Sequence, residues 1–268
     1  MKTSRRDLLK ALGMGTVAGA LAPAILTPQP VHASTELTYG GPDLAGWTTV
    51  LGDGLYTAAG QDPVHIGDIS TEHHGSHTTL HANSAQRGVM AHNLTYQSIQ
   101  DAAAFDYVHI CGYKFRLPYL PTPGAWPHNA QTIEGALMLW DGANTRMDHG
   151  MAFQWVLNPW MGSFGEIWAW SGEQGGQWVP SGFLAVDTEW HEVQMVYDHR
   201  NQATALRIDG VSFPSVVSQT PKPAWWGNEV AGRFNAEIIS LWPGTTATAA
   251  PSHLAEVKEW YWNWVSYE

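Results

Sequence analysis

Cysteine is almost absent from this 268-residue sequence, which contains only Cys111. A single cysteine excludes an intramolecular disulfide, so the fold has to be stabilised by its hydrophobic core, which a chain of this length can supply. Cys111 lies in a mostly apolar stretch. We expect it to behave as a small, buried hydrophobic residue.

Positive charge is also scarce: the chain has 13 Lys and Arg against 24 Asp and Glu, and its net charge is −11. Nucleic acids and anionic membranes bind clusters of Lys and Arg, so the composition argues against both as partners. Only 14% of the residues are charged, which is too few to indicate disorder. The sequence carries no motif for a nucleotide, haem or an iron–sulfur cluster, and no cofactor is firmly implied.

The first residues have the layout of an export signal. An Arg pair in Ser4–Lys10 precedes an uncharged run rich in Gly and Ala, Ala11–Leu26, and Val31–Ala33 offers a small-x-small cleavage site. Ser4–Lys10 resembles the twin-arginine consensus, with Leu8 where that consensus has Phe. Gly and Pro interrupt the run, which is too weakly apolar for a stable membrane span. We expect residues 1–33 to be a twin-arginine signal peptide, and the rest to be secreted to the periplasm or beyond the cell.

Long helical periodicity is missing from residues 34–268, where Gly and Pro separate many short apolar runs. This pattern is typical of a β-sandwich or barrel, and no linker or repeat divides it, so we predict a single all-β domain over 34–268. Alternation of apolar and polar residues predicts strands over Trp47–Leu51, Asp68–Thr71, Thr78–Ala82, Tyr107–Leu117, Thr132–Trp140, Gly150–Leu157, Glu166–Trp170, Trp190–Tyr197, Thr204–Ile208, Ala236–Trp242 and Val257–Val265.

One predicted hairpin carries a family resemblance. Trp190–Asp198 followed by Ala203–Gly210 is similar to a W-H-x-V-x-V-x-Y-D … A-x-L-x-I-D-G stretch of the concanavalin A-like lectin/glucanase superfamily, especially its laminin-G-like members. The late strand Val257–Trp264 also resembles one of that superfamily. The resemblance implies a jelly-roll β-sandwich of two antiparallel sheets. It leaves the function open, because the superfamily includes lectins, glycosidases, polysaccharide lyases and adhesion modules.

Tryptophan is abundant, with 15 residues, and exposed indoles can stack on sugar rings. The resemblance implies a concave sheet lined with such side chains, so we predict a protein that binds a polysaccharide or other glycan. Trp260, Trp262 and Trp264 alternate on one strand and are more typical of a core. The predicted carbohydrate-binding residues are Trp140, Glu166, Trp168, Trp170, Glu192, Gln194 and Arg207.

Two alternatives stay open. A glycoside hydrolase on the same fold would need two facing carboxylates, and the candidates on predicted strands are Glu134, Glu166, Glu192 and Glu237. The single-strand E-x-D-x-E motif of the superfamily's glycosidases is missing, and a lyase fits less well because few Lys and Arg are available for an acidic sugar. The second alternative is a structural or adhesion module whose tryptophans are nearly all core.

Two metal sites are conceivable. His73, His77 and His81 belong to a His-rich segment, and imidazole is a common ligand of zinc and copper. Neither a helix nor a straight strand would bring the three together without a turn, so surface-loop histidines are the simpler interpretation. Calcium is possible at a turn with oxygen ligands from Asp141, Asn144 and Asp148.

Overall fold

A computed structural model describes residues 37–53, 55–82, 89–100, 107–121, 130–140, 149–159, 161–171, 176–215, 231–240 and 253–267. These segments are mainly β-strands, with one short 3₁₀ helix, η1 (Ile66–Asp68). Within them, no helix has both the length and the apolar character needed to cross a lipid bilayer. The expected signal peptide, residues 1–33, and the proposed calcium ligands Asp141, Asn144 and Asp148 lie outside the described residues.

The described strands form two sheets, each of eight strands, and all of their pairings are antiparallel. We name them sheet A and sheet B. In spatial order, sheet A contains β14 (Val211–Phe213), β13 (Ala203–Ile208), β12 (His191–Asp198), β7 (Tyr107–Arg116), β16 (His253–Ser266), β5 (Thr78–Ala82) and β4 (Ile69–His73), with β1 (Leu37–Gly41) also paired to β16.

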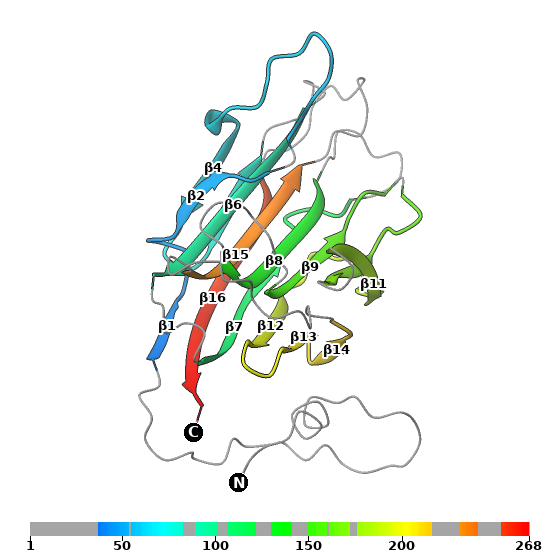
Figure 1. The fold of residues 1–268 in the computed structure, drawn as a ribbon. Helices are drawn as coiled ribbons and strands as arrows, with labels where there is room; N and C mark the ends of the chain where they lie inside the picture. The colour runs from blue at the N-terminus through cyan, green and yellow to red at the C-terminus, as the bar shows by residue number, and fades with distance from the viewer. Residues whose placement is uncertain are drawn as a thin grey trace.

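Sheet B lies over sheet A, and Figure 1 shows β16 passing behind β15. In spatial order, sheet B contains β11 (Gln177–Phe183), β10 (Glu166–Ser171), β9 (Gly150–Val156), β8 (Ala130–Trp140), β15 (Ala231–Ser240), β6 (Val89–Ile99) and β2 (Thr48–Leu51), with β3 (Tyr56–Thr57) also paired to β6. The inner faces of the two sheets enclose one hydrophobic core. The fold is therefore the predicted all-β jelly-roll sandwich of two antiparallel sheets.

The β12–β13 hairpin has the predicted faces. Val193, Met195 and Tyr197 are buried in the core, whereas Gln194 and Arg207 face each other across the two strands on the outer side. The turn to β14 is made by Asp209 and Gly210, whose φ angles are +52° and +76°. Two consecutive positive φ angles are the requirement of a tight two-residue hairpin turn, which an Asp-Gly pair meets with little strain.

The tryptophans of β16 are core residues. Trp260, Trp262 and Trp264 are at most 8% exposed. The Trp262 indole donates a hydrogen bond to Nδ1 of His109 (3.1 Å), and its ring lies against Phe234 of the opposite sheet, with centroids 6.1 Å apart. These side chains hold the two sheets together and are not part of a sugar platform.

Strand β6 was missed by the sequence analysis because its inner face is partly polar. Asn93 is fully buried, and its amide donates to the backbone carbonyls of Ser70 (2.6 Å) and His81 (2.9 Å) in sheet A. Its side-chain oxygen accepts a hydrogen bond from Thr95 (2.9 Å). These bonds satisfy a buried polar group that would otherwise be costly. At this position the two sheets are therefore joined by the hydrogen bonds from Asn93 to Ser70 and His81 and not by apolar contact.

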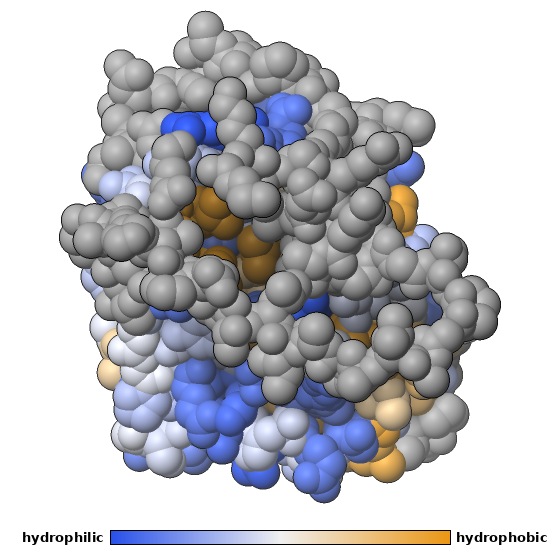
Figure 2. Space-filling model, turned by 90° about the horizontal axis from the view of Figure 1, so that it is seen from below, coloured by the Kyte–Doolittle hydropathy of each residue, from blue (hydrophilic) through white to orange (hydrophobic). Residues whose placement is uncertain are grey.

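The outer surface is largely hydrophilic at one end of the sandwich. Figure 2 shows hydrophilic residues over much of the described surface seen from below, and hydrophobic residues in separate patches. Hydrophobic side chains are concentrated instead between the sheets. The polar side chains that could form a binding or catalytic site therefore lie on the two outer faces.

Candidate functional site

Two glutamates lie side by side on the outer face of sheet B. Glu134 of β8 is directly opposite Glu237 of β15 in the antiparallel register. Side chains that face each other in this way start only about 4.5–5.5 Å apart at Cβ. Both are buried, with exposed fractions of 9% and 6%. The fold thus pairs two of the four glutamates that were predicted as catalytic candidates.

The pair belongs to a row that crosses sheet B. Gln154 of β9 is opposite Glu134 and donates a hydrogen bond to its carboxylate, and Trp168 of β10 is opposite Gln154. On the other side of the pair, Leu94 of β6 is opposite Glu237. Aromatic, amide, acidic and aliphatic side chains therefore follow one another across five strands.

The proximity of the two carboxylates has an electrostatic consequence. Burial, and in second place the neighbouring Glu237 carboxylate, raises the pKa of Glu134 well above its usual range, against the smaller lowering effect of the hydrogen bond from Gln154. Two adjacent buried carboxylates cannot both ionise easily. The site therefore holds a proton to higher pH than an isolated glutamate would.

Other polar atoms around the pair lack partners. His92 Nδ1 is 3.1 Å from Glu237 Oε1, but Nε2 of the same ring is buried without a hydrogen bond among the described residues. Asn235 is 3% exposed, and its side-chain oxygen is also without a partner in this part of the chain. Buried polar atoms are nearly always hydrogen-bonded. Both atoms therefore point to a ligand or solvent that completes the site.

These residues line a cavity of about 280 Å³ on the outer face of sheet B. Trp178 of β11 forms an apolar part of its wall and packs edge-on against Trp170, with ring centroids 5.3 Å apart. Arg233 is 4% exposed, and its guanidinium lies 3.7 Å from the centroid of the Tyr96 ring. With Asp53 also in its lining, the cavity combines three carboxylates, a guanidinium, an imidazole, two amides and an indole.

The predicted sugar-binding residues are divided between the two sheets. Glu166, Trp168 and Trp170 alternate along β10 on the face that carries the glutamate pair, and the Trp168 indole donates to Glu166 Oε2 (2.7 Å). Trp140 is the last residue of β8. The remaining residues, Glu192, Gln194 and Arg207, lie on the outer face of sheet A. They therefore form a separate surface.

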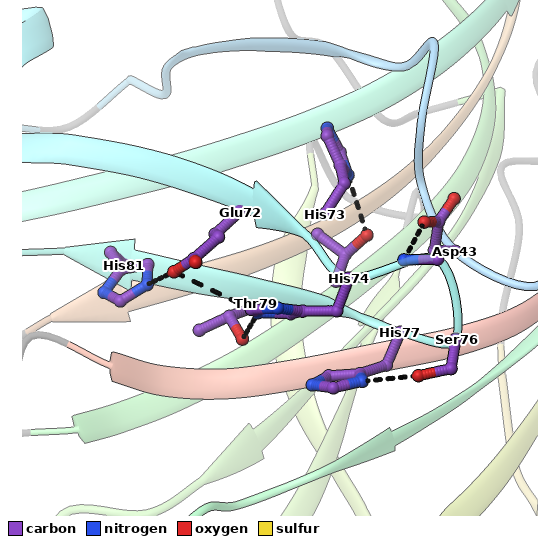
Figure 3. A network of polar contacts seen from close by, with 10 residues as sticks. Asp43, Glu72, His73, His74, Ser76, His77, Thr79 and His81 are labelled. Carbon is purple, nitrogen blue, oxygen red and sulfur yellow. Dashed lines mark hydrogen bonds and ion pairs between the residues drawn. The ribbon is translucent and has the colours of Figure 1, made fainter.

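The His-rich segment forms the β4–β5 hairpin. Figure 3 shows that the three proposed ligands make different contacts: His73 Nδ1 is 2.9 Å from Thr78 Oγ1, His77 stacks on His74, and His81 is 3.8 Å from Glu72, which His74 also approaches. The register sets His73 opposite Thr78 and His81 opposite Ser70, so the three proposed ligands are not brought together. Among the described residues no three His, Cys, Asp or Glu side chains are placed to hold a metal ion.

Several residues of the cavity were not identified from the sequence. His92 lies on β6, whose polar inner face hid the strand, and Trp178 lies on β11, which was also not predicted. Arg233 and Asn235 precede the start that was predicted for β15. Alternation of residues around Trp178 could have indicated β11. Placing the start of β15 before Ala236 would have included Arg233 and Asn235.

No protein-family model matches the sequence, and no curated protein matches it. Solved structures with a similar fold include peanut lectin, with 9% identity over 88% of this chain and 100% of the lectin and a TM-score of 0.49. Lectin II from Ulex europaeus has 12% identity over 80% and 99%, with a TM-score of 0.45. Arcelin-5 from Phaseolus vulgaris, a lectin-like defence protein, has 11% identity over 87% and 100%, with a TM-score of 0.46. At such identities the likeness extends to the fold alone.

Proposed function

We propose that this protein binds a carbohydrate in the cavity on the outer face of sheet B. The observation that carries the proposal is the combination of the buried glutamate pair with an indole wall in one cavity. Sugars present hydroxyl groups that both donate and accept hydrogen bonds, and C–H faces that pack on aromatic rings. Glu134 and Glu237 supply acceptors, and Trp178 supplies the apolar surface.

The unpartnered atoms of the cavity support the same ligand class. His92 Nε2 and Asn235 Oδ1 remain unsatisfied in the described part of the protein, and a sugar hydroxyl can pair with either type of atom. Arg233 adds donors close to Glu237. A purely apolar ligand would leave these groups unpaired, which would cost free energy for each of them.

The test is binding to a panel of neutral polysaccharides and oligosaccharides. Trp178→Ala is expected to weaken binding by up to about tenfold, because an aromatic contact contributes about 0.5–1.5 kcal/mol. Phe183→Ala is the matched control, since Phe183 is 64% exposed on the same strand and does not line the cavity. Equal binding by both variants and the unchanged protein would refute this site.

A second candidate function is glycoside hydrolysis at the same cavity. The observation that favours it is the raised pKa of Glu134 beside Glu237, since glycosidic bond cleavage requires a carboxylic acid with a raised pKa next to a second carboxylate. Reducing ends should then be released from a bound glycan, and Glu134→Gln or Glu237→Gln should each abolish the release. Binding without any release would leave a binding protein. If the protein neither binds a glycan nor releases reducing ends from one, a structural or adhesion module would be favoured.

Export by the twin-arginine route is part of the proposal. It rests on the Arg pair in Ser4–Lys10 and predicts a protein that folds before it is secreted. Changing Arg5 and Arg6 together to Lys should retain the protein in the cytoplasm, while the reverse change, Lys2 and Lys10 together to Arg, should not. Unchanged export of the variant with Lys at positions 5 and 6 would disprove this route.

A further inference from the structure

A second depression, of about 490 Å³, lies on the outer face of sheet A, on the other side of the sandwich from the glutamate pair. Four strands supply its floor: Arg207 of β13 is opposite Gln194 of β12, and Lys114 of β7 lies between Glu192 of β12 and Lys258 of β16. The depression therefore has its own set of charged residues, none of which belongs to the sheet B cavity.

Trp190, which immediately precedes β12, forms part of the wall of the depression. Its ring has the Arg116 guanidinium 4.6 Å from its centroid and the Lys258 ammonium 4.5 Å from it. Four of the chain's 13 Lys and Arg residues thus gather at one place in an acidic protein. Such cation–π contacts fix the indole and the cations relative to each other.

Most of these charges are already paired. Lys114 and Lys258 both contact the carboxylate of Glu259, the second of them at 3.2 Å. Asp209 accepts hydrogen bonds from His191 Nδ1 (2.7 Å) and from the backbone N–H of Glu192 (2.9 Å). The positions of the lysines and of the hairpin turn are therefore set by contacts within the protein.

Arg207 is the exception. It is half-buried, no described residue forms an ion pair with it, and its Nε is buried without a hydrogen bond in the described part of the chain. A guanidinium is charged at all physiological pH values, and its planar fork matches a carboxylate with two parallel hydrogen bonds. A half-buried guanidinium that has no ion-pair partner among the described residues and lies at the floor of a depression therefore favours an anionic ligand.

We propose that this depression is a second glycan-binding site, specific for a sugar that carries a carboxylate, a uronic acid. Arg207 binds the carboxylate, while Gln194 and Glu192 take hydroxyl groups of the same ring. Glu192 and Asp209 in the lining limit the positive charge, so a singly charged carboxylate suits the site better than a phosphate with nearly two charges. This proposal does not rest on the sheet B site.

Calorimetric titration of the full chain with galacturonate oligomers, and with neutral galactose oligomers of the same length, tests the proposal. The galacturonate oligomers are expected to bind at least about tenfold more tightly through sheet A, equivalent to about 1.4 kcal/mol. Arg207→Gln should remove that advantage, and Arg207→Lys should keep part of it because the charge remains. Trp178→Ala, in the other cavity, should leave it unchanged.

Three results would overturn the proposal. The first is equal affinity for acidic and neutral oligomers in the Trp178→Ala protein, where neutral-sugar binding in the sheet B cavity is weakened and the comparison reports on sheet A. The second is full galacturonate binding by a folded Arg207→Gln protein. The third is displacement of the oligomer by an equal concentration of inorganic phosphate, which would indicate a general anion site. If Trp178→Ala loses only neutral-sugar binding, that result tests the sheet B site and leaves the sheet A proposal unaffected.

Discussion

Replacement of Trp262 by alanine is expected to lower the free energy of unfolding by about 3–5 kcal/mol, the range for a large aromatic removed from a packed core. Trp262 is fully buried, and its ring contacts Phe234 in the opposite sheet and Trp264 on its own strand. The change leaves a cavity between the sheets. It also leaves Nδ1 of His109 without the indole donor. Urea denaturation followed by circular dichroism measures the loss.

Trp262→Phe separates packing from hydrogen bonding. It keeps most of the ring contact with Phe234 but not the indole N–H, so its loss should be clearly smaller than that of Trp262→Ala. Ile66→Ala serves as the control for a change on the surface, since Ile66 is 59% exposed and lies outside the core, and it should alter stability by no more than about 0.5 kcal/mol. A loss below about 1 kcal/mol for Trp262→Ala would contradict the core assignment of β16.

The β12–β13 hairpin is predicted correctly from the sequence because the two faces of its strands differ in polarity. Each predicted strand overlaps an observed one. On β12, the alternation of Val193, Met195 and Tyr197 with outward residues identifies which side enters the core, and the Asp209-Gly210 turn is recognisable from its residue types alone. Local pattern is sufficient in these cases because both strand faces and the turn are encoded within a few residues.

Strand β6 shows where local pattern fails. Its inner positions include Asn93 and Thr95, both fully buried, so the strand does not alternate between apolar and polar residues. Asn93 is tolerated inside because its partners are backbone carbonyls of Ser70 and His81 in the other sheet. Those partners are fixed by the packing of the two sheets, which no window of sequence contains.

The candidate site was only partly predictable for the same reason. Glu134 and Glu237 could each be placed on a strand, but their pairing depends on the β8–β15 register, between strands far apart in the chain. Register also determines that Gln194 and Arg207 belong to sheet A rather than to the surface carrying Trp168. The strands of Glu134, Glu237, Gln194 and Arg207 could be predicted from the sequence, whereas the sheet to which each strand belongs could not.

The division of these residues between two faces changes how the protein is expected to interact with glycans. The sheet B cavity is acidic and lined by Trp178, and it suits a neutral sugar. The sheet A depression is larger and contains the unpaired charge of Arg207 among the described residues. A protein with both sites would engage two different sugars from opposite sides of the sandwich, and linkage of two sites strengthens binding to a polymer that carries both.

Glu134→Gln is expected to stabilise the protein at neutral pH and to make its stability less dependent on pH. The folded-state pKa of Glu134 is raised by burial and then by Glu237, so the folded protein binds this proton more tightly than the unfolded chain does. The free energy of unfolding should therefore be unaffected by this group below the usual glutamate pKa and should decrease as pH rises above it. For one proton the slope is at most about 1.4 kcal/mol per pH unit.

Glutamine cannot ionise, so the variant avoids this decrease while its side-chain oxygen can still accept the hydrogen bond from Gln154. Chemical denaturation of both proteins at pH 4 and at pH 7.5 measures the effect: their stabilities should be similar at pH 4, and the variant should be the more stable at pH 7.5. Glu192→Gln makes the same substitution at an exposed position on the outer face of sheet A and is the matched control. Two results would show that the glutamate pair is not under electrostatic strain. One is a Glu134→Gln protein that is less stable than the unchanged protein at pH 7.5, and the other is a difference in unfolding free energy that is the same at both pH values. In that case the acid that glycoside hydrolysis requires would also be missing from this cavity.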